Sequence, residues 1–162
     1  MSPTQSQDRH YLRSPLLFVT GHWEVVGDAN DWARGLYHRH YSRYKYHDGR
    51  NPKKFTGPGQ TISLLSWDGS ALFVWRKFIS MDKVHGHGIN CAVFRNEGKA
   101  RSSELILEAE GYARLKWPGE RFYTYVNPKK IRSTNPGYCF KAAGWRFVKI
   151  TPGGLHLLEK SS

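Results

Sequence analysis

The sequence predicts an α/β domain, because strand-like runs and helical periodicities alternate along a single chain of 162 residues. Hydrophobic residues make up 39% of the chain and aromatic residues 14%, enough apolar surface to bury a sizeable core. The length suits one domain. Residues 1–14 are polar and aperiodic, so we expect a mobile tail there and a single folded unit over 15–162.

Local patterns in the first half predict a strand, a helix, a loop and a hairpin. In order, we expect a strand within Leu16–Val26, a helix over about 31–42, a loop over His47–Gly59 and hairpin strands at Thr61–Trp67 and Ala71–Ile79. Residues 28–31 supply helix-capping side chains. The hairpin is the clearest signal, because Asp68-Gly69-Ser70 supplies a turn between two strand-like runs.

The second half predicts two helices and four strands. In order, these are a strand at Ile89–Phe94, a helix within 100–117, a strand at Phe122–Val126, a short helix at Asn135–Ala143 and closing strands at Trp145–Ile150 and Leu155–Leu158. The long helix is the most secure element, because Leu105, Ala109 and Ala113 step by four and Pro118-Gly119 stops the run.

Several protein classes are excluded by composition. Cys91 and Cys139 are too few for a disulfide scaffold and lack the spacing of a structural zinc site. The apolar run Leu16–Val19 is too short for a signal-peptide core or a membrane span. We therefore expect no membrane partner and a reducing, cytoplasmic setting, with both cysteines as core thiols.

The charge favours polyanionic partners. The chain has 25 Lys+Arg against 13 Asp+Glu, a formal net charge of +12, and such a charge attracts nucleic acid by releasing its condensed counterions. Cations and aromatic rings are interleaved between Tyr41 and Phe55, a pattern typical of surfaces that hold a phosphate backbone and stack unpaired bases. A solvated basic loop is the equal alternative. The candidate substrate contacts are Tyr41, Arg43, Lys45, Lys129, Lys130 and Arg132.

The loop between the strand at 89–94 and the long helix has the features of a phosphate site. The segment Arg95-Asn96-Glu97-Gly98-Lys99-Ala100 carries cations and a glycine, and the first amides of a helix favour a bound phosphate. By itself this signal is modest, since many strand-to-helix turns contain glycine and a basic residue.

This segment resembles the R/Q-x-x-G-x-G/A motif of the GNAT (GCN-related N-acetyltransferase) superfamily, which that family carries between its fourth strand and third helix. Here it follows the fourth predicted strand and precedes the long helix, so its place in the chain matches. The resemblance spans roughly residues 61–160. It implies a GNAT-like domain with a mixed, mostly antiparallel central sheet flanked by helices. It also implies that Arg95, Asn96, Glu97, Gly98, Lys99 and Ala100 bind acetyl-CoA or another acyl-CoA through the loop's backbone amides.

The resemblance departs from the family at one catalytic position. Where the family often places a tyrosine that protonates the departing thiolate, this chain has Phe140. We therefore expect proton transfer or positioning from Tyr138, Tyr125 and Ser103. Strand amides near Asn90–Phe94 are expected to polarise the acyl carbonyl.

The segments 40–46, 95–106 and 123–145 resemble more loosely the phage Mom-like DNA-modification branch of the superfamily. This resemblance implies modification of the exocyclic amine of adenine, with DNA likelier than RNA and a bacterial host cell if the gene is phage-encoded. Such an enzyme flips its base or meets it unpaired. Two alternatives stay open: a GNAT enzyme for a small amine, a polyamine or aminoacyl-tRNA, and a nucleic-acid-binding module without catalysis.

Histidines give only a weak metal signal. His38 and His40 do not share a helix face, whereas His85 and His87 would share a strand face without a nearby carboxylate. We predict no metal site, and a homodimer is left open.

Overall fold

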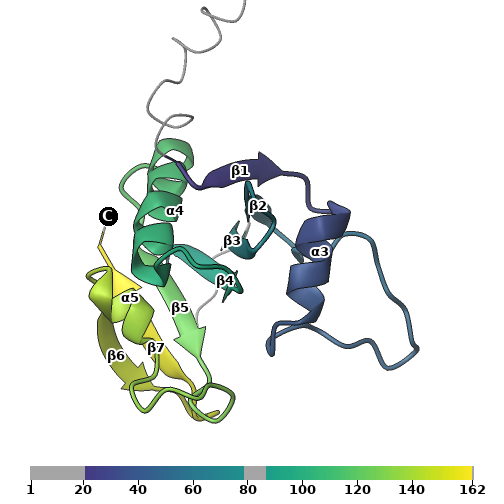
Figure 1. Ribbon diagram of the computed structural model, residues 1–162. Coiled ribbons are helices and arrows are strands. Elements are labelled where there is room, and N and C mark those ends of the chain that lie inside the picture. Colours follow the sequence, from purple (N-terminus) through teal and green to yellow (C-terminus); the bar gives the residue numbers. More distant parts are fainter. Residues whose placement is uncertain (1–20, 79–86, 162) are drawn as a thin grey trace, which may run out of the picture.

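Seven strands form one open sheet in the computed structural model, which describes residues 21–78 and 87–161 (Figure 1). The strand order is β1-β2-β3-β4-β5-β7-β6, and every neighbouring pair is antiparallel except β4 and β5. The strands are β1 (Trp23–Val26), β2 (Gln60–Ser66), β3 (Ala71–Lys77), β4 (Ile89–Asn96), β5 (Phe122–Val126), β6 (Arg146–Ile150) and β7 (His156–Lys160). The predicted α/β class and the mostly antiparallel sheet are confirmed.

Three helices of the described residues cover the sheet on both faces (Figure 1). α4 (Ser102–Lys116) and α5 (Tyr138–Ala142) pack on one face, and α3 (Asp31–His38) packs on the other. Strand alternation divides β3 between two cores: Phe73 and Trp75 join the α4 side, while Leu72 and Val74 join the α3 side. The central strands are therefore apolar on both faces, which explains their continuous hydrophobic runs.

Two helix boundaries were predicted wrongly. The helix expected over 31–42 ends at His38, because the backbone N–H of Ser42 turns to His40 Nδ1 (3.1 Å) and that of Tyr44 to the Tyr37 hydroxyl (2.7 Å). The helix expected from Asn135 begins at Tyr138, because Gly137 has a left-handed φ of 73° that no helix continues through. The predicted tail at 1–14, the first part of the expected first strand and His85 lie outside the described residues.

The joint between β4 and β5 is short. Their parallel register holds only Ile89 opposite Phe122 and Asn90 opposite Tyr123, although β4 runs on to Asn96 and β5 to Val126. β4 also carries a bulge, since Val74 faces Val93 and Trp75 faces Cys91, leaving Ala92 without an opposite residue on β3. Beyond Asn90 the two strands therefore part, and β4 presents an irregular backbone toward the gap.

Candidate functional site: two adjoining cavities

The gap between β4 and β5 opens into a cavity of about 360 Å³, which we term the inter-strand cavity. Cys91, Ala92 and Phe94 line it from β4, and Thr124, Tyr125 and Val126 from β5. The remaining lining residues are His40, Tyr41, Ser42, Ile131, Ser133, Asn135, Gly137, Tyr138, Cys139 and Phe140. Thr124 Oγ1 donates to the carbonyl of Cys91 at 2.9 Å, so one side-chain contact bridges the parted strands.

α4 begins in the motif loop without a side-chain cap. Its N-cap residue is Arg101, and no side chain accepts a hydrogen bond from the first turn. Within the described residues, the amides of residues 99–103 have no hydrogen-bond acceptor. Uncapped amides at the positive end of a 15-residue helix favour an anion.

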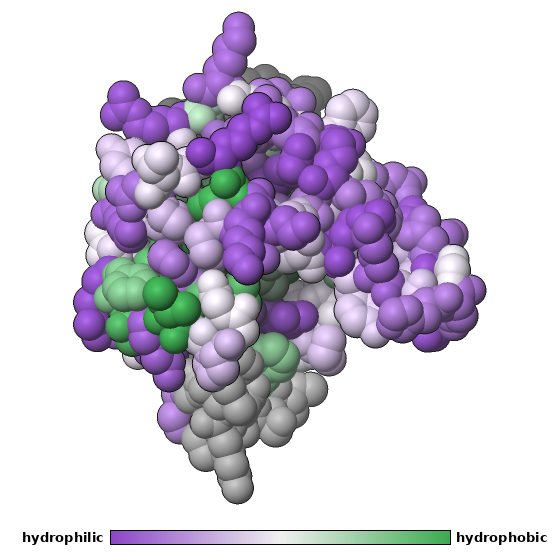
Figure 2. Space-filling view, turned by 90° about the horizontal axis from the view of Figure 1, so that it is seen from below, coloured by the Kyte–Doolittle hydropathy of each residue, from purple (hydrophilic) through white to green (hydrophobic). Residues whose placement is uncertain are grey.

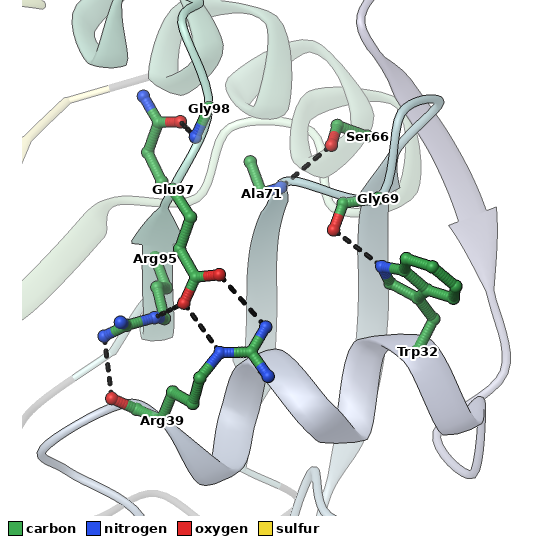
Figure 3. A network of polar contacts seen from close by, with 9 residues as sticks. Trp32, Arg39, Ser66, Gly69, Ala71, Arg95, Glu97 and Gly98 are labelled. Atoms are coloured by element: carbon green, nitrogen blue, oxygen red, sulfur yellow. Dashed lines mark hydrogen bonds and ion pairs between the residues drawn. The ribbon is translucent and has the colours of Figure 1, made fainter.

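Two amides of the predicted loop are already engaged. The Glu97 N–H donates to the Ser70 carbonyl at 2.8 Å. The Gly98 N–H donates to Asn96 Oδ1 at 2.9 Å (Figure 3). Asn96 also bonds through Nδ2 to the Ala100 carbonyl at 2.8 Å, which ties the loop together. In this conformation the predicted phosphate contacts reduce to the amides from Lys99 onward.

Arg95 and Glu97 fasten the motif loop to α3 (Figure 3). The Glu97 carboxylate accepts hydrogen bonds from Arg39 (2.8 and 3.0 Å) and from Arg95, while Arg95 Nη1 donates to the Arg39 carbonyl at 2.7 Å. Hydrogen bonds from Arg39 and then Arg95 lower the pKa of Glu97 to about 2. The Arg95 side chain, predicted to bind the cofactor, is thus engaged in an ion-pair network.

The predicted proton-transfer residues are partly brought together. Tyr125 and Tyr138 line the inter-strand cavity, whereas Ser103 lies in the first turn of α4 and lines neither of the two cavities described here. Tyr138 follows the turn at Gly137 and is 62% exposed, while Phe140 packs into the core at 6%. Position 140 therefore differs from the family's tyrosine in two ways: the side chain has no proton to donate, and it packs in the core.

Tyr41 lies with Tyr125 and Tyr138 at the inter-strand cavity. The sequence predicted it as a substrate contact rather than as a neighbour of the proton-transfer residues. It lines the inter-strand cavity, its hydroxyl accepts a hydrogen bond from the Asn127 N–H at 3.3 Å, and burial raises its pKa. Cys91 is buried in the core, and burial raises the pKa of both Cys91 and Cys139. Neither thiol is poised as a thiolate nucleophile.

His40 and Ser42 form a hydrogen-bonded pair that the sequence analysis missed. His40 Nδ1 lies 2.7 Å from Ser42 Oγ and accepts the Ser42 N–H at 3.1 Å. Because Nδ1 accepts, we assign the proton to Nε2. Burial, and then the charge of Arg95, lower the pKa of His40 to about 4, so its ring is neutral at pH 7. The spacing H-Y-S on a helix end gave no hint of this contact, which a tight turn creates.

A second cavity lies on the α3 side and is enclosed by the predicted basic and aromatic segment. This basic cavity has a volume of about 910 Å³. It is lined by Tyr37, His38, Ser42, Arg43, Tyr44, Lys45, Tyr46, Gly49, Arg50, Asn51, Pro52, Lys54, Phe55, Thr56, Gly57, Pro58, Val74, Arg76, Ala92 and Val93. The lining holds five cationic side chains and no carboxylate. Figure 2 shows hydrophilic side chains gathered over the loop after α3, which lies on the right as in Figure 1.

The two cavities share Ser42 and Ala92. Ser42, which is hydrogen-bonded to His40, and Ala92, the bulge residue of β4, therefore lie where the two cavities adjoin. Of the predicted substrate contacts, Arg43 and Lys45 line the basic cavity. Lys129, Lys130 and Arg132 instead lie exposed on the loop after β5, whose residues Ile131 and Ser133 line the inter-strand cavity.

Over residues 21–78 and 87–161, no group of three histidine, cysteine, aspartate or glutamate side chains is arranged to hold a metal ion. Among the helices of those same ranges, none has the length and apolar character to cross a membrane. No family model matches the sequence, and neither a curated protein nor a solved structure gave a match.

Proposed function

We propose that this protein is a GNAT-type N-acyltransferase that moves an acyl group from acyl-CoA to an amine on nucleic acid, most specifically to adenine in DNA. The observation that carries the proposal is the parting of β4 and β5, which opens a cavity along β4, the strand that leads through the motif loop into the uncapped start of α4. A second cavity rich in cations and rings adjoins it at Ser42 and Ala92. The acyl-CoA would occupy the inter-strand cavity and the nucleic-acid amine would enter from the basic cavity, so the two substrates would meet at Ser42 and Ala92.

An acyl-CoA would extend from the start of α4, where its pyrophosphate would bind, along β4 to the inter-strand cavity. The unpartnered amides of residues 99–103 of the described chain, with the Lys99 and Arg101 side chains, favour its pyrophosphate. The apolar strand residues Ala92, Phe94 and Val126 suit an acyl arm between β4 and β5. The acyl-CoA supplies an activated thioester carbonyl, and the β4 backbone near the bulge offers amides to polarise it.

Proton transfer is assigned to groups on either side of the junction. As the acceptor nitrogen forms its bond to the acyl carbon, its proton passes to Ser42 Oγ while the hydroxyl proton passes to His40 Nδ1. The C–S bond breaks, and the thiolate takes a proton from the hydroxyl of Tyr138 or Tyr125, which line the same cavity. A neutral His40 is required for this route, and burial keeps it neutral.

The decisive experiment is mass spectrometry of nucleosides from the DNA of cells that express the protein. A heavier nucleoside that requires the protein supports DNA modification, and its mass identifies the added group. Gly98→Trp is a poor negative control, because even a Cβ at Gly98 would lie 2.2 Å from Ser70 Oγ and would disturb the fold. Position 103 offers a better pair of variants.

Ser103→Asp and Ser103→Ala separate anion binding from folding. An aspartate in the first turn of α4 interacts favourably with the helix dipole but repels a pyrophosphate. We expect Ser103→Asp to lower acyl-CoA affinity about tenfold or more, a loss of roughly 1.4 kcal/mol, with an unchanged or higher Tm. Calorimetric titration and thermal melts measure the two effects.

The neutral Ser103→Ala variant is the matched control. If it binds acyl-CoA as the wild type does, the loss in Ser103→Asp is electrostatic. If it binds normally but loses turnover, the predicted catalytic role of the Ser103 hydroxyl is supported. Unchanged affinity in Ser103→Asp would contradict acyl-CoA binding at this helix start.

Phe140 favours one alternative, a nucleic-acid-binding module without catalysis, because it is buried and has no proton to give. Tight DNA binding with no measurable acyl-CoA affinity would select that alternative. Acyl-CoA binding with weakly salt-dependent acceptor binding would instead select a small amine or polyamine as the substrate.

A further inference from the structure

We propose that Arg76 forms an anion site inside the basic cavity and that this site holds the phosphate of a single nucleotide extruded into the cavity. The inference deepens the proposed function and rests on it for the nucleic-acid substrate. Arg76 lies outside the basic and aromatic segment, Tyr41 to Phe55, for which the sequence predicted contacts with nucleic acid.

Arg76 is a cation set into the sheet. It lies on β3, opposite Thr61 of β2 and Asn90 of β4, and its side chain lines the basic cavity. Its Nε is buried without a hydrogen-bond partner, and its one hydrogen bond within the described residues is a long one, 3.4 Å from Nη1 to the Thr56 carbonyl. The guanidinium stacks over Phe78 at 4.8 Å from the ring centroid. No carboxylate of the described residues pairs with it.

A half-buried guanidinium without a counter-ion is costly, and burial lowers the pKa of Arg76. An incoming anion would remove that cost. The planar guanidinium presents paired N–H groups that match a phosphate, and it lies over the Phe78 ring.

His38 supplies a second unsatisfied donor in the same cavity. Its Nδ1 lies 3.4 Å from Arg43 Nη1, so we assign Nδ1 as the acceptor and place the proton on Nε2. That Nε2 is buried without a partner among the described residues. Two buried donors that lack acceptors, in one cavity without a carboxylate, point to an anionic ligand.

The loop over Arg76 is shaped around its guanidinium. A Cβ at Gly57 would lie 2.5 Å from Arg76 Nη1, and Gly57 has a left-handed φ of 80°. The left-handed backbone favours glycine here, and it lets the loop pass close to the end of the Arg76 side chain. Gly57 and Pro58 both line the cavity.

The walls suit a nucleotide rather than phosphate alone. Tyr37 and Phe55 stack with ring centroids 5.3 Å apart, and Tyr44 meets Tyr46 edge-on at 4.8 Å. Such rings give a base a surface for stacking. A volume of about 910 Å³ accommodates a nucleotide, and a base brought here would approach Ser42 at the junction of the cavities.

The test measures binding of dAMP, deoxyadenosine and inorganic phosphate by calorimetry, without acyl-CoA. We expect dAMP to bind the wild type at least tenfold more tightly than either fragment, since losing a hydrogen bond to a charged group costs about one order of magnitude in affinity. Inorganic phosphate binding as tightly as dAMP, or deoxyadenosine doing so, would overturn the nucleotide assignment.

Arg76→Gln is the test variant, and Arg50→Gln is the matched control. Arg50 lines the same cavity, but its side chain is 66% exposed and pairs with Asp48. We expect Arg76→Gln to weaken dAMP binding about tenfold or more and Arg50→Gln to weaken it less than about threefold. Equal dAMP affinity in Arg76→Gln and wild type would overturn the proposal.

Folding is checked independently. Because Arg76 carries an uncompensated charge, Arg76→Gln is expected to melt no lower than the wild type. If that variant fails to fold, the wild type alone still decides: dAMP at a hundred times its dissociation constant must raise the Tm, and no rise would overturn the site.

The two proposals fail separately. dAMP binding that depends on Arg76, with no acyl-CoA binding, would keep the nucleotide site and remove the transferase. A modified nucleoside formed at the wild-type level by Arg76→Gln would keep the transferase and remove this site.

Discussion

His40 shows how one turn of backbone changes what a side chain can do. Its Nδ1 faces Ser42, and its pKa of about 4 lies below the ordinary 6.5. The unfolded chain therefore takes up a proton as the pH falls through 6.5, while the folded protein does not until about pH 4. The contribution of neutral His40 to stability is complete above pH 6.5 and is lost between pH 6.5 and 4.

This difference predicts a pH effect. The Tm of the wild type should fall more steeply between pH 6.5 and 4 than that of His40→Gln, which has no imidazole to protonate. Thermal melts over that range measure the difference, and NMR of the His40 ring reports its titration directly. Parallel melting curves, or a ring that titrates near pH 6.5, would contradict the buried, neutral state.

Single residues differed in how visible they were in the sequence. The motif loop at 95–100 was found because its residue types are adjacent in the chain, and the structure does place it at the start of α4. Arg76 gave no signal, because one arginine in a strand pattern looks the same whether it ends in water or in a cavity. His40 was considered only as a metal ligand, since its contact with Ser42 depends on the end of α3.

Elements were predicted better than their ends. The sequence pointed to each of the ten described strands and helices, through hydrophobic periodicity for α4 and through turn residues for the β2–β3 hairpin. The ends of α3 and the start of α5 depend on side chains that compete for backbone groups and on the left-handed Gly137. Such details are decided by local geometry rather than by periodicity.

The turn before α5 makes a prediction about packing. Gly137 and Gly119 have nearly equal φ values, 73° and 78°, but a Cβ at 137 would lie 2.3 Å from Leu158 Cδ1, whereas one at 119 would meet nothing within 4 Å. We expect Gly119→Ala to cost about 1 kcal/mol and Gly137→Ala roughly 3 kcal/mol, since only the second adds overpacking to backbone strain.

Chemical denaturation of both variants measures these costs. Gly119→Ala controls for the left-handed backbone, so the difference between the two isolates the contact with Leu158, which is fully buried and cannot swing aside. Equal costs would mean that the α5 turn relaxes. In that case the position of Tyr138 at the inter-strand cavity would be less constrained than the geometry indicates.

At the scale of the whole molecule, the net charge of +12 is partly concentrated around the basic cavity, which five Lys and Arg side chains line. Whether DNA binds to that cavity or to diffuse surface charge can therefore be tested. Lys45 and Lys54 line the basic cavity, whereas Lys149 lies exposed on the edge strand β6 outside it. If single-stranded DNA follows the basic cavity, Lys45→Gln with Lys54→Gln should flatten the slope of log affinity against log salt by about 1.4, or roughly 0.7 for each phosphate that is no longer neutralised.

Lys149→Gln is the matched control and should leave the slope unchanged. Binding assays at several salt concentrations give both slopes. An equal effect from all three lysines would show that DNA is attracted by diffuse charge, and the basic cavity would then lose its role as the DNA site. The overall charge was plain from the sequence, but its concentration around one cavity depends on the packing of segments that are distant in the chain.

The two-residue joint between β4 and β5 has a mechanical consequence. It divides the sheet into a part of four strands and a part of three. Beside that joint, hydrogen bonds from Thr124 to the Cys91 carbonyl and from Arg121 to the His87 carbonyl cross the boundary, and one hydrophobic core packs against both parts. Strand pairing is shortest at this boundary, so backbone amides along it should exchange with solvent before those at the centres of the two parts. A ligand bound between β4 and β5 would contact both parts of the sheet and would couple their motions. Amide exchange along this boundary should then slow when the ligand binds.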